Sequence, residues 1–126
     1  MEKSFSERVA EAKANVSSVS AVEAKKFRDS DPKCLIIDPR DASDIYSTTG
    51  MIPGALRVSL KQLNDEADTD LPLALASRSR TIITACQAGP MGALAAYALK
   101  QRGFNNVRYI DGGTQGWLDA GYTTMR

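Results

Sequence analysis

Short apolar segments alternate with segments of helical pattern through most of the chain. Residues 34–38, 80–85 and 107–110 form three such apolar runs. Runs of this length are typical of strands that are buried on both faces, as they are in a parallel sheet. Helical segments between them supply the crossovers that parallel pairing needs. The alternation therefore predicts an α/β fold with a mainly parallel sheet.

Local signals place the remaining elements. Ser20 and Glu23 fit a capping box, in which each side chain satisfies a backbone N–H of the other residue, so a helix is expected at 21–29. Gly103 is expected to end an alanine-rich helix that covers 93–101. The other expected elements are a strand at 56–58, helices at 42–46 and 71–77, and a last helix that begins at Thr114.

The first residues have a helical pattern of their own. Phe5, Val9, Ala12 and Val16 recur at helical spacing with charged residues between them, which predicts an amphipathic helix within residues 4–16. Such a helix packs either on its own domain or on a partner. We treat residues 1–17 as an N-terminal helical extension and residues 18–126 as one domain, because 126 residues suit a single core.

Composition excludes several classes of partner. The formal net charge is +1, so no strong basic character indicates nucleic acid. No apolar run approaches the roughly 18 residues that a membrane helix needs. The acidic segment 64–70 is expected to be solvated. The polar N-terminus lacks the apolar region of a signal peptide, so a cytoplasmic location is expected.

The chain contains no histidine. This absence removes Ser-His-Asp and Cys-His arrangements and makes a zinc site very unfavourable. Its two cysteines, Cys34 and Cys86, do not make a disulfide scaffold. We therefore predict no metal and no cofactor, and a reactive cysteine would depend on backbone dipoles and cationic side chains.

Cys86 follows the predicted strand at 80–85 and precedes the predicted helix at 93–101. In such a loop, several backbone N–H groups and the positive end of a helix converge, and this field favours a thiolate and attracts anions. The alternative is a buried cysteine that closes a core strand. Cys34 opens a buried strand and is expected to be inert.

Four segments together resemble a single rhodanese domain, the sulfurtransferase module. Asp38-Pro39-Arg40 is similar to the family's Asp-x-Arg after an early strand, and residues 50–55, Gly-Met-Ile-Pro-Gly-Ala, are similar to its Gly-His-Ile-Pro-Gly-Ala. The loop at Cys86, and residues 103–107 followed by Asp111-Gly112-Gly113 and Trp117, complete the pattern. The resemblance covers about residues 18–122 and implies a five-stranded sheet with helices on both faces.

The resemblance also implies a reaction. The Cys86 thiolate would take the outer sulfur of thiosulfate or a related sulfane donor, and the persulfide would pass it to cyanide, a thiol or a protein. Loop N–H groups from Gln87, Ala88, Gly89, Met91 and Gly92 would bind the anionic donor. A different possibility is a rhodanese-like binding, regulatory or sulfur-carrier module with little thiosulfate turnover. Both a monomer and a homodimer stay open.

The chain departs from the family pattern at two places. Met51 replaces the histidine before Ile-Pro-Gly-Ala, which we expect to be a structural change. Pro90-Met91 stands where many active loops carry a cation, and proline has no N–H to donate. Weaker thiosulfate binding follows, although Pro90 also suits a first helical turn. Because residues 86–92 contain no arginine or lysine, a phosphate dianion would lack its bidentate partner, which argues against a phosphatase or an arsenate reductase.

Two charged residues have competing roles. Arg40 either contributes positive charge to substrate binding or forms a salt bridge with Asp38 or Asp44. Asp38 is expected to accept hydrogen bonds at its strand end, in support of the site, rather than to act as a catalytic acid. Trp117 is expected to pack the last helix on the sheet.

Overall fold

The computed structural model describes residues 2–64 and 71–126. It contains a five-stranded sheet in the order β1-β5-β4-β2-β3. All four strand pairings are parallel within these ranges. The strands are β1 (Ser17–Val19), β2 (Leu35–Asp38), β3 (Leu56–Arg57), β4 (Ile82–Thr84) and β5 (Val107–Ile110). The α/β prediction with a central parallel sheet is confirmed.

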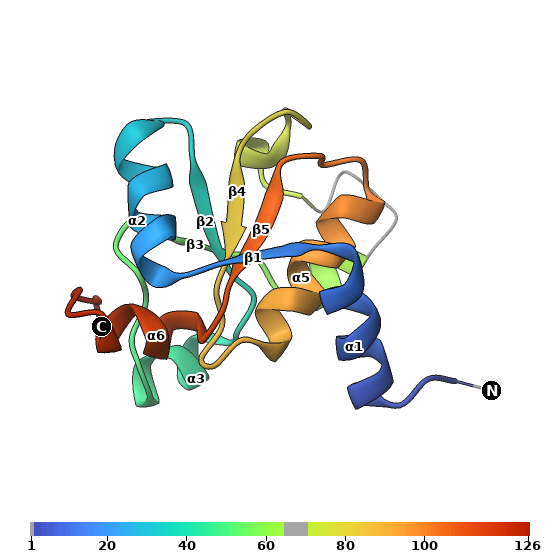
Figure 1. Ribbon diagram of the computed structural model, residues 1–126, viewed down its shortest axis with the longest axis horizontal. Coiled ribbons are helices and arrows are strands. Elements are labelled where there is room, and N and C mark those ends of the chain that lie inside the picture. The colour runs from blue at the N-terminus through green and yellow to red at the C-terminus, as the bar shows by residue number, and fades with distance from the viewer. Residues whose placement is uncertain (1, 65–70) are drawn as a thin grey trace.

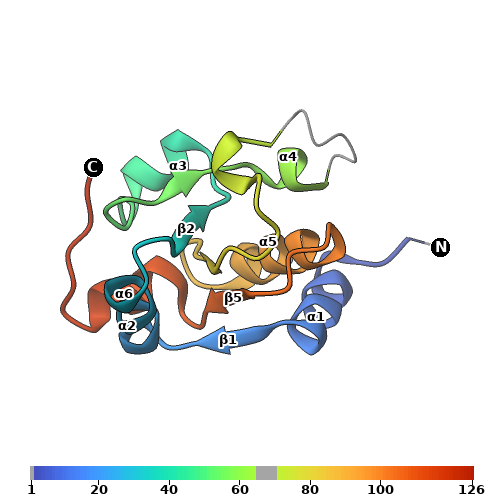
Figure 2. The same cartoon turned by 90° about the horizontal axis from the view of Figure 1, so that it is seen from above.

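Helices cover both faces of the sheet (Figures 1 and 2). The helices α2 (Ala21–Ser30) and α6 (Gly113–Asp119) pack together on one face. On the other face, α5 (Pro90–Gln101) is central and contacts both α1 (Phe5–Asn15) and α4 (Leu60–Asn64). Two short elements, α3 (Ala42–Ser47) and the 3-10 helix η2 (Leu73–Leu75), lie in the connections. No helix in the described ranges is both long and apolar enough to span a membrane.

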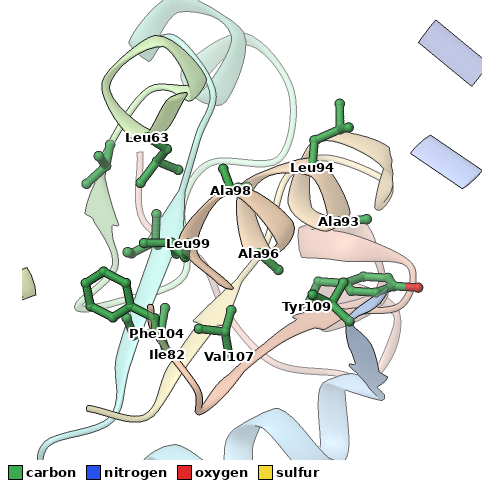
Figure 3. Packing of buried hydrophobic residues seen from close by; sticks show 14 of the residues in the cluster. Leu63, Ile82, Ala93, Leu94, Ala96, Ala98, Leu99, Phe104, Val107 and Tyr109 are labelled. Carbon is green, nitrogen blue, oxygen red and sulfur yellow. The ribbon is translucent and has the colours of Figure 1, made fainter. Parts of the chain in front are cut away.

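The larger core cluster is built around α5. Its alanines let the helix approach the sheet closely, and Leu99, Ala95 and Ala96 have no exposed surface. Figure 3 shows side chains of this cluster gathered around α5, among them Leu63, Leu99 and Phe104. This packing fixes the position of the N-terminus of α5 relative to the end of β4.

The smaller cluster lies under α2 and α6. Trp117 is 1% exposed and packs there with Ile36, Ile83 and Ile110 from the sheet. The indole N–H of Trp117 donates to the carbonyl of Thr123, 2.8 Å away. The expectation that Trp117 packs the last helix on the sheet is therefore confirmed.

Several boundaries differ from the predictions. The strand β1 and the helix α4 had no predicted counterpart, because each is short and has no distinct apolar pattern. The helix expected at 93–101 begins three residues earlier, at Pro90, which occupies its first turn. The helix expected at 71–77 is only the 3-10 turn η2. The prediction for the acidic segment concerns residues 65–70, which lie outside the described ranges, and Asn64, which ends α4.

A capping box is present at the start of α2 and another at the start of α1. Ser20 accepts from the Glu23 N–H and the Glu23 carboxylate accepts from the Ser20 N–H, as predicted, and Ser4 and Glu7 form the same arrangement at α1. These hydrogen bonds lower the pKa of the Glu7 and Glu23 carboxyl groups. Ala12 of α1 and Val16, which caps the C-terminal end of this helix, belong to the core around α5. The division into 1–17 and 18–126 stays a prediction; its boundary falls inside β1.

A buried ion pair closes the end of β2. Asp38 and Arg40 are 1% and 3% exposed, and their side chains form a bidentate pair, Nε–Oδ1 at 2.9 Å and Nη2–Oδ2 at 2.6 Å. The remaining Arg40 N–H groups donate to the hydroxyls of Thr48 and Thr49 and to the carbonyl of Gly50. The pair therefore holds the 48–50 loop against the sheet.

The C-terminal residues 124–126 form hydrogen bonds with the same loop and with Met51. Met51 and Met125 form an antiparallel bridge with two N–H to carbonyl bonds of 2.8 Å. The Thr124 hydroxyl donates to the carbonyl of Thr49, and Arg126 donates to that of Thr48. Met51, which replaces the family's histidine, thus has a structural role through its backbone.

Arg40→Met should strongly destabilise the fold, because it leaves the buried Asp38 carboxylate without its partner. Breaking such a pair from one side costs about 3–5 kcal/mol. The matched control is Arg57→Met, since Arg57 is exposed and lies beside Asp38 in the β2–β3 register. That change should alter the free energy of unfolding by about 0.5 kcal/mol or less. Urea denaturation measures both, and an equally small loss in both variants would contradict the structural role of the pair.

Candidate active site

Parallel pairing brings the predicted site residues to one edge of the sheet. Asp38 ends β2, Cys86 follows β4 and Asp111 follows β5, so all three lie at the carboxyl ends of strands. In open parallel sheets, ligands bind at this edge. We call residues 86–92, which join β4 to α5 at this edge, the cysteine loop.

The sulfur of Cys86 accepts a hydrogen bond from within the cysteine loop. The N–H of Gly89 donates to Cys86 Sγ over 3.0 Å, and Cys86 is only 3% exposed. Gly89 is the N-cap of α5 and has a φ of +127°, a conformation that favours glycine. Pro90 follows in the first turn, where its missing N–H leaves no helical hydrogen bond unmade.

Five other N–H groups of the loop have no acceptor in the described parts of the chain. They belong to Cys86, Gln87, Ala88, Met91 and Gly92. The last two lie in the first turn of α5, where N–H groups have no intrahelical partner and the helix dipole is positive. Gln87 and Ala88 are exposed, and Met91 is partly exposed. The loop therefore carries a set of unpaired N–H donors and no cationic side chain, and the binding of an anion to these donors stays a prediction.

A hydrogen bond from Thr84 holds the cysteine loop to the end of β4. The Thr84 hydroxyl donates to the carbonyl of Gly92 over 2.5 Å, which ties the end of β4 to the first turn of α5. A Cβ on Gly92 would come within 3.4 Å of the Cys86 nitrogen. Gly92 therefore serves close packing of the loop on the helix in addition to its unpaired N–H.

The helix α6 also holds the cysteine loop, through two backbone hydrogen bonds. The N–H groups of Thr114 and Gln115, at the start of α6, donate to the carbonyls of Cys86 and Gln87 at 2.7 and 2.9 Å. We call this pair of hydrogen bonds the α6 clip. Sequence reasoning did not predict it and used Gly112-Gly113 only as part of the family pattern. The available signal was this pair of consecutive glycines at the start of a short helix.

Arg40 does not reach the cysteine loop with a hydrogen bond. Its five hydrogen bonds to side chains and carbonyls match the five N–H groups of a guanidinium, and Asp38 neutralises its charge. Of the alternatives left open by the sequence, the salt bridge with Asp38 is the one that forms. Asp38 accepts three hydrogen bonds from Arg40, which agrees with a supporting role.

Cys34 lies at the opposite edge of the sheet from Cys86. It directly precedes β2 and is therefore at the amino ends of the parallel strands, whereas Cys86 is at their carboxyl ends. Burial raises the pKa of the Cys34 thiol, and Asp31 raises it further. Cys34 is thus suited to an unreactive role.

Comparisons with known structures identify the fold. A protein of unknown function from Rhodopseudomonas palustris, described as a possible tyrosine phosphatase, superposes with a TM-score of 0.85 at 22% identity and covers 99% of this chain and 96% of its own. The polysulfide-sulfur transferase homodimer from Wolinella succinogenes gives a TM-score of 0.74 at 22% identity over 96% of this chain and 86% of its own. A human single-domain sulfurtransferase gives 0.66 at 20% identity over 83% and 97%.

Sequence comparison narrows the assignment to a family. No curated protein matches the sequence. Residues 20–120 match the rhodanese-like domain family, and this range contains the Asp38–Arg40 pair, the cysteine loop and the α6 clip. The resemblance drawn from four short motifs is therefore confirmed: this chain belongs to the rhodanese-like domain family.

Proposed function

We propose that the protein is a sulfurtransferase in which Cys86 carries a persulfide. The observation that carries this proposal is the position of Cys86 Sγ, which accepts from the Gly89 N–H within a loop of unpaired backbone donors. Membership of the rhodanese-like family and the fold shared with sulfurtransferases support it.

The reaction takes two displacements. The Cys86 thiolate attacks the outer sulfur of thiosulfate, and the sulfur–sulfur bond breaks with its electron pair leaving on sulfite. The terminal sulfur of the Cys86 persulfide is then attacked by an acceptor, and the thiolate of Cys86 leaves. The Gly89 N–H, which donates to Cys86 Sγ, and the unpaired N–H groups of the same loop stabilise the anionic species in both steps, so no general base is required.

The absence of a cation in the loop bears on the choice of donor. Pro90 and Met91 stand at the mouth of the loop, both partly exposed, and neither carries charge. Donors of lower charge than thiosulfate, such as organic persulfides or polysulfides, fit this mouth. Cyanide, a small thiol or a protein thiol is the acceptor. We extend the proposal to a cytoplasmic location, with monomer and homodimer both compatible.

One observation favours a second candidate. Residues 86–92 contain neither lysine nor arginine, and the second candidate is therefore a binding, regulatory or sulfur-carrier module with little thiosulfate turnover. The same observation argues against a phosphatase, since a phosphoryl dianion would have no guanidinium to bind it. The two candidates differ in whether sulfur taken up at Cys86 is passed on to an acceptor with turnover.

Wild-type protein incubated with thiosulfate should gain one sulfur atom that a reductant removes, because the thiolate of Cys86 displaces sulfite. Cys86→Ser should gain none, whereas Cys34→Ser should behave as wild type, since Cys34 lies at the opposite edge of the sheet. Intact-protein mass spectrometry reads the gain, and added cyanide tests the second displacement by removing it. Equal loss in both cysteine variants would contradict a single nucleophile. A gain that no acceptor removes would favour the second candidate.

Met91→Arg should lower the KM for thiosulfate, because it places a cation beside the unpaired N–H groups. A partly exposed charge pair contributes up to about 1 kcal/mol, or about fivefold in KM. The control Met91→Gln adds polarity without charge and should leave KM near the wild-type value. Steady-state kinetics at low and high salt measure the effect, which should shrink as salt rises. A KM that is unchanged or higher in Met91→Arg would refute the electrostatic reasoning.

A further inference from the structure

The α6 clip acts on two consecutive peptide groups of the cysteine loop. Its acceptors are the carbonyls of Cys86 and Gln87. In a trans peptide, the carbonyl of one residue and the N–H of the next point in opposite directions. Fixing these two carbonyls toward α6 therefore directs the N–H groups of Gln87 and Ala88 away from α6. Neither of those N–H groups has an acceptor among the residues that the structure describes.

The approach between α6 and the loop leaves no room for a side chain at Gly113. A Cβ at this position would come within 2.7 Å of the Cys86 carbonyl oxygen, 2.8 Å of the Gln87 oxygen and 2.9 Å of the Ala88 nitrogen. These are backbone atoms, so the contact could be relieved only by moving the loop or the helix. Figure 1 shows the start of α6 beside the connection between β4 and α5.

From these contacts we propose that Gly113 is a positioning residue for sulfur transfer. Through the α6 clip, it sets the direction of the Gln87 and Ala88 N–H groups, so that they face the anion bound at Cys86 Sγ. The proposal deepens and rests on the proposed sulfurtransferase function. It predicts that a variant with a disturbed α6 clip loses more free energy of anion binding at Cys86 than free energy of unfolding.

The chain offers a matched pair of variants. Gly121 follows the other end of α6 and also has a positive φ, +90° against +61° at Gly113. A Cβ on Gly121 would meet nothing within 4 Å. Gly113→Ala and Gly121→Ala therefore share the cost of alanine in a left-handed conformation, and only the first pushes on the cysteine loop.

The readout is the ratio of alkylation rates of Cys86 with iodoacetate and iodoacetamide, followed by peptide mass spectrometry. The reagents are close in size and consume the same thiolate, so the ratio cancels access and thiolate population and reports recognition of the carboxylate. In Gly113→Ala the ratio should fall about tenfold, the factor for losing one hydrogen bond to a charged group. In Gly121→Ala it should stay at the wild-type value. Similar ratios in the two variants would overturn the proposal.

A second pair of variants decides the matter if Gly113→Ala does not fold. Gln115→Pro deletes the N–H that donates to the Gln87 carbonyl, in the first turn of α6, where this N–H has no intrahelical partner. Gln115→Ala keeps that N–H and removes only the exposed side chain, which bonds Asp119. The iodoacetate preference should fall in the proline variant and persist in the alanine variant. Equal ratios in both would also overturn the proposal.

Sulfur transfer is measured separately on the same variants. Alkylation of Cys86 does not require sulfurtransferase activity, so failure of the proposed function leaves the ratio test intact. If wild type forms the persulfide, Gly113→Ala should raise the KM for thiosulfate while Gly121→Ala does not. If wild type shows the iodoacetate preference but forms no persulfide, the proposed role of the α6 clip would stand and the proposed sulfur-transfer reaction would be rejected.

Discussion

Parallel pairing of the strands is the constraint on which the arrangement of this molecule depends. Because the described strand pairs all run in one direction, the end of β2, the cysteine loop after β4 and the turn after β5 meet at one edge. Each crossover returns through a helix, and the helices bury the two faces of the sheet. The site is therefore assembled from segments that lie far apart in sequence but end at the same level.

Arg40 was a candidate for substrate binding, but it has a structural role. It is buried, and its guanidinium N–H groups donate to Asp38 and to the 48–50 loop. The cysteine loop has no cation of its own. In the proposed function, recognition of an anion at Cys86 is therefore left to backbone N–H groups, and the strength of their hydrogen bonds depends on direction. On this proposal, the first turn of α6 contributes to function without touching the substrate.

The loop is held from two sides before any ligand arrives. Thr84 ties the first turn of α5 to β4, and the α6 clip ties the Cys86 and Gln87 carbonyls to the opposite helix. Both helices are anchored in core clusters, α5 through Leu99 and α6 through Trp117. Donors that are already oriented need no reorganisation as charge develops on sulfur, which is the physical basis of electrostatic preorganisation. These few hydrogen bonds connect the two cores to the cysteine loop, where we propose that sulfur transfer takes place.

Sequence alone determined the features that depend on local chemistry. The apolar runs of β2, β4 and β5 gave the fold class, and the capping box at Ser20 and the first-turn role of Pro90 follow from short-range geometry. The short strand β1 and helix α4 escaped prediction, because pairing and packing with distant segments, rather than their own residues, stabilise them. Only the tertiary structure decided between the two roles of Arg40 and placed Gly113 against the Cys86 carbonyl. Both outcomes depend on how the chain is folded around the sheet, and one sequence carries no direct record of that proximity.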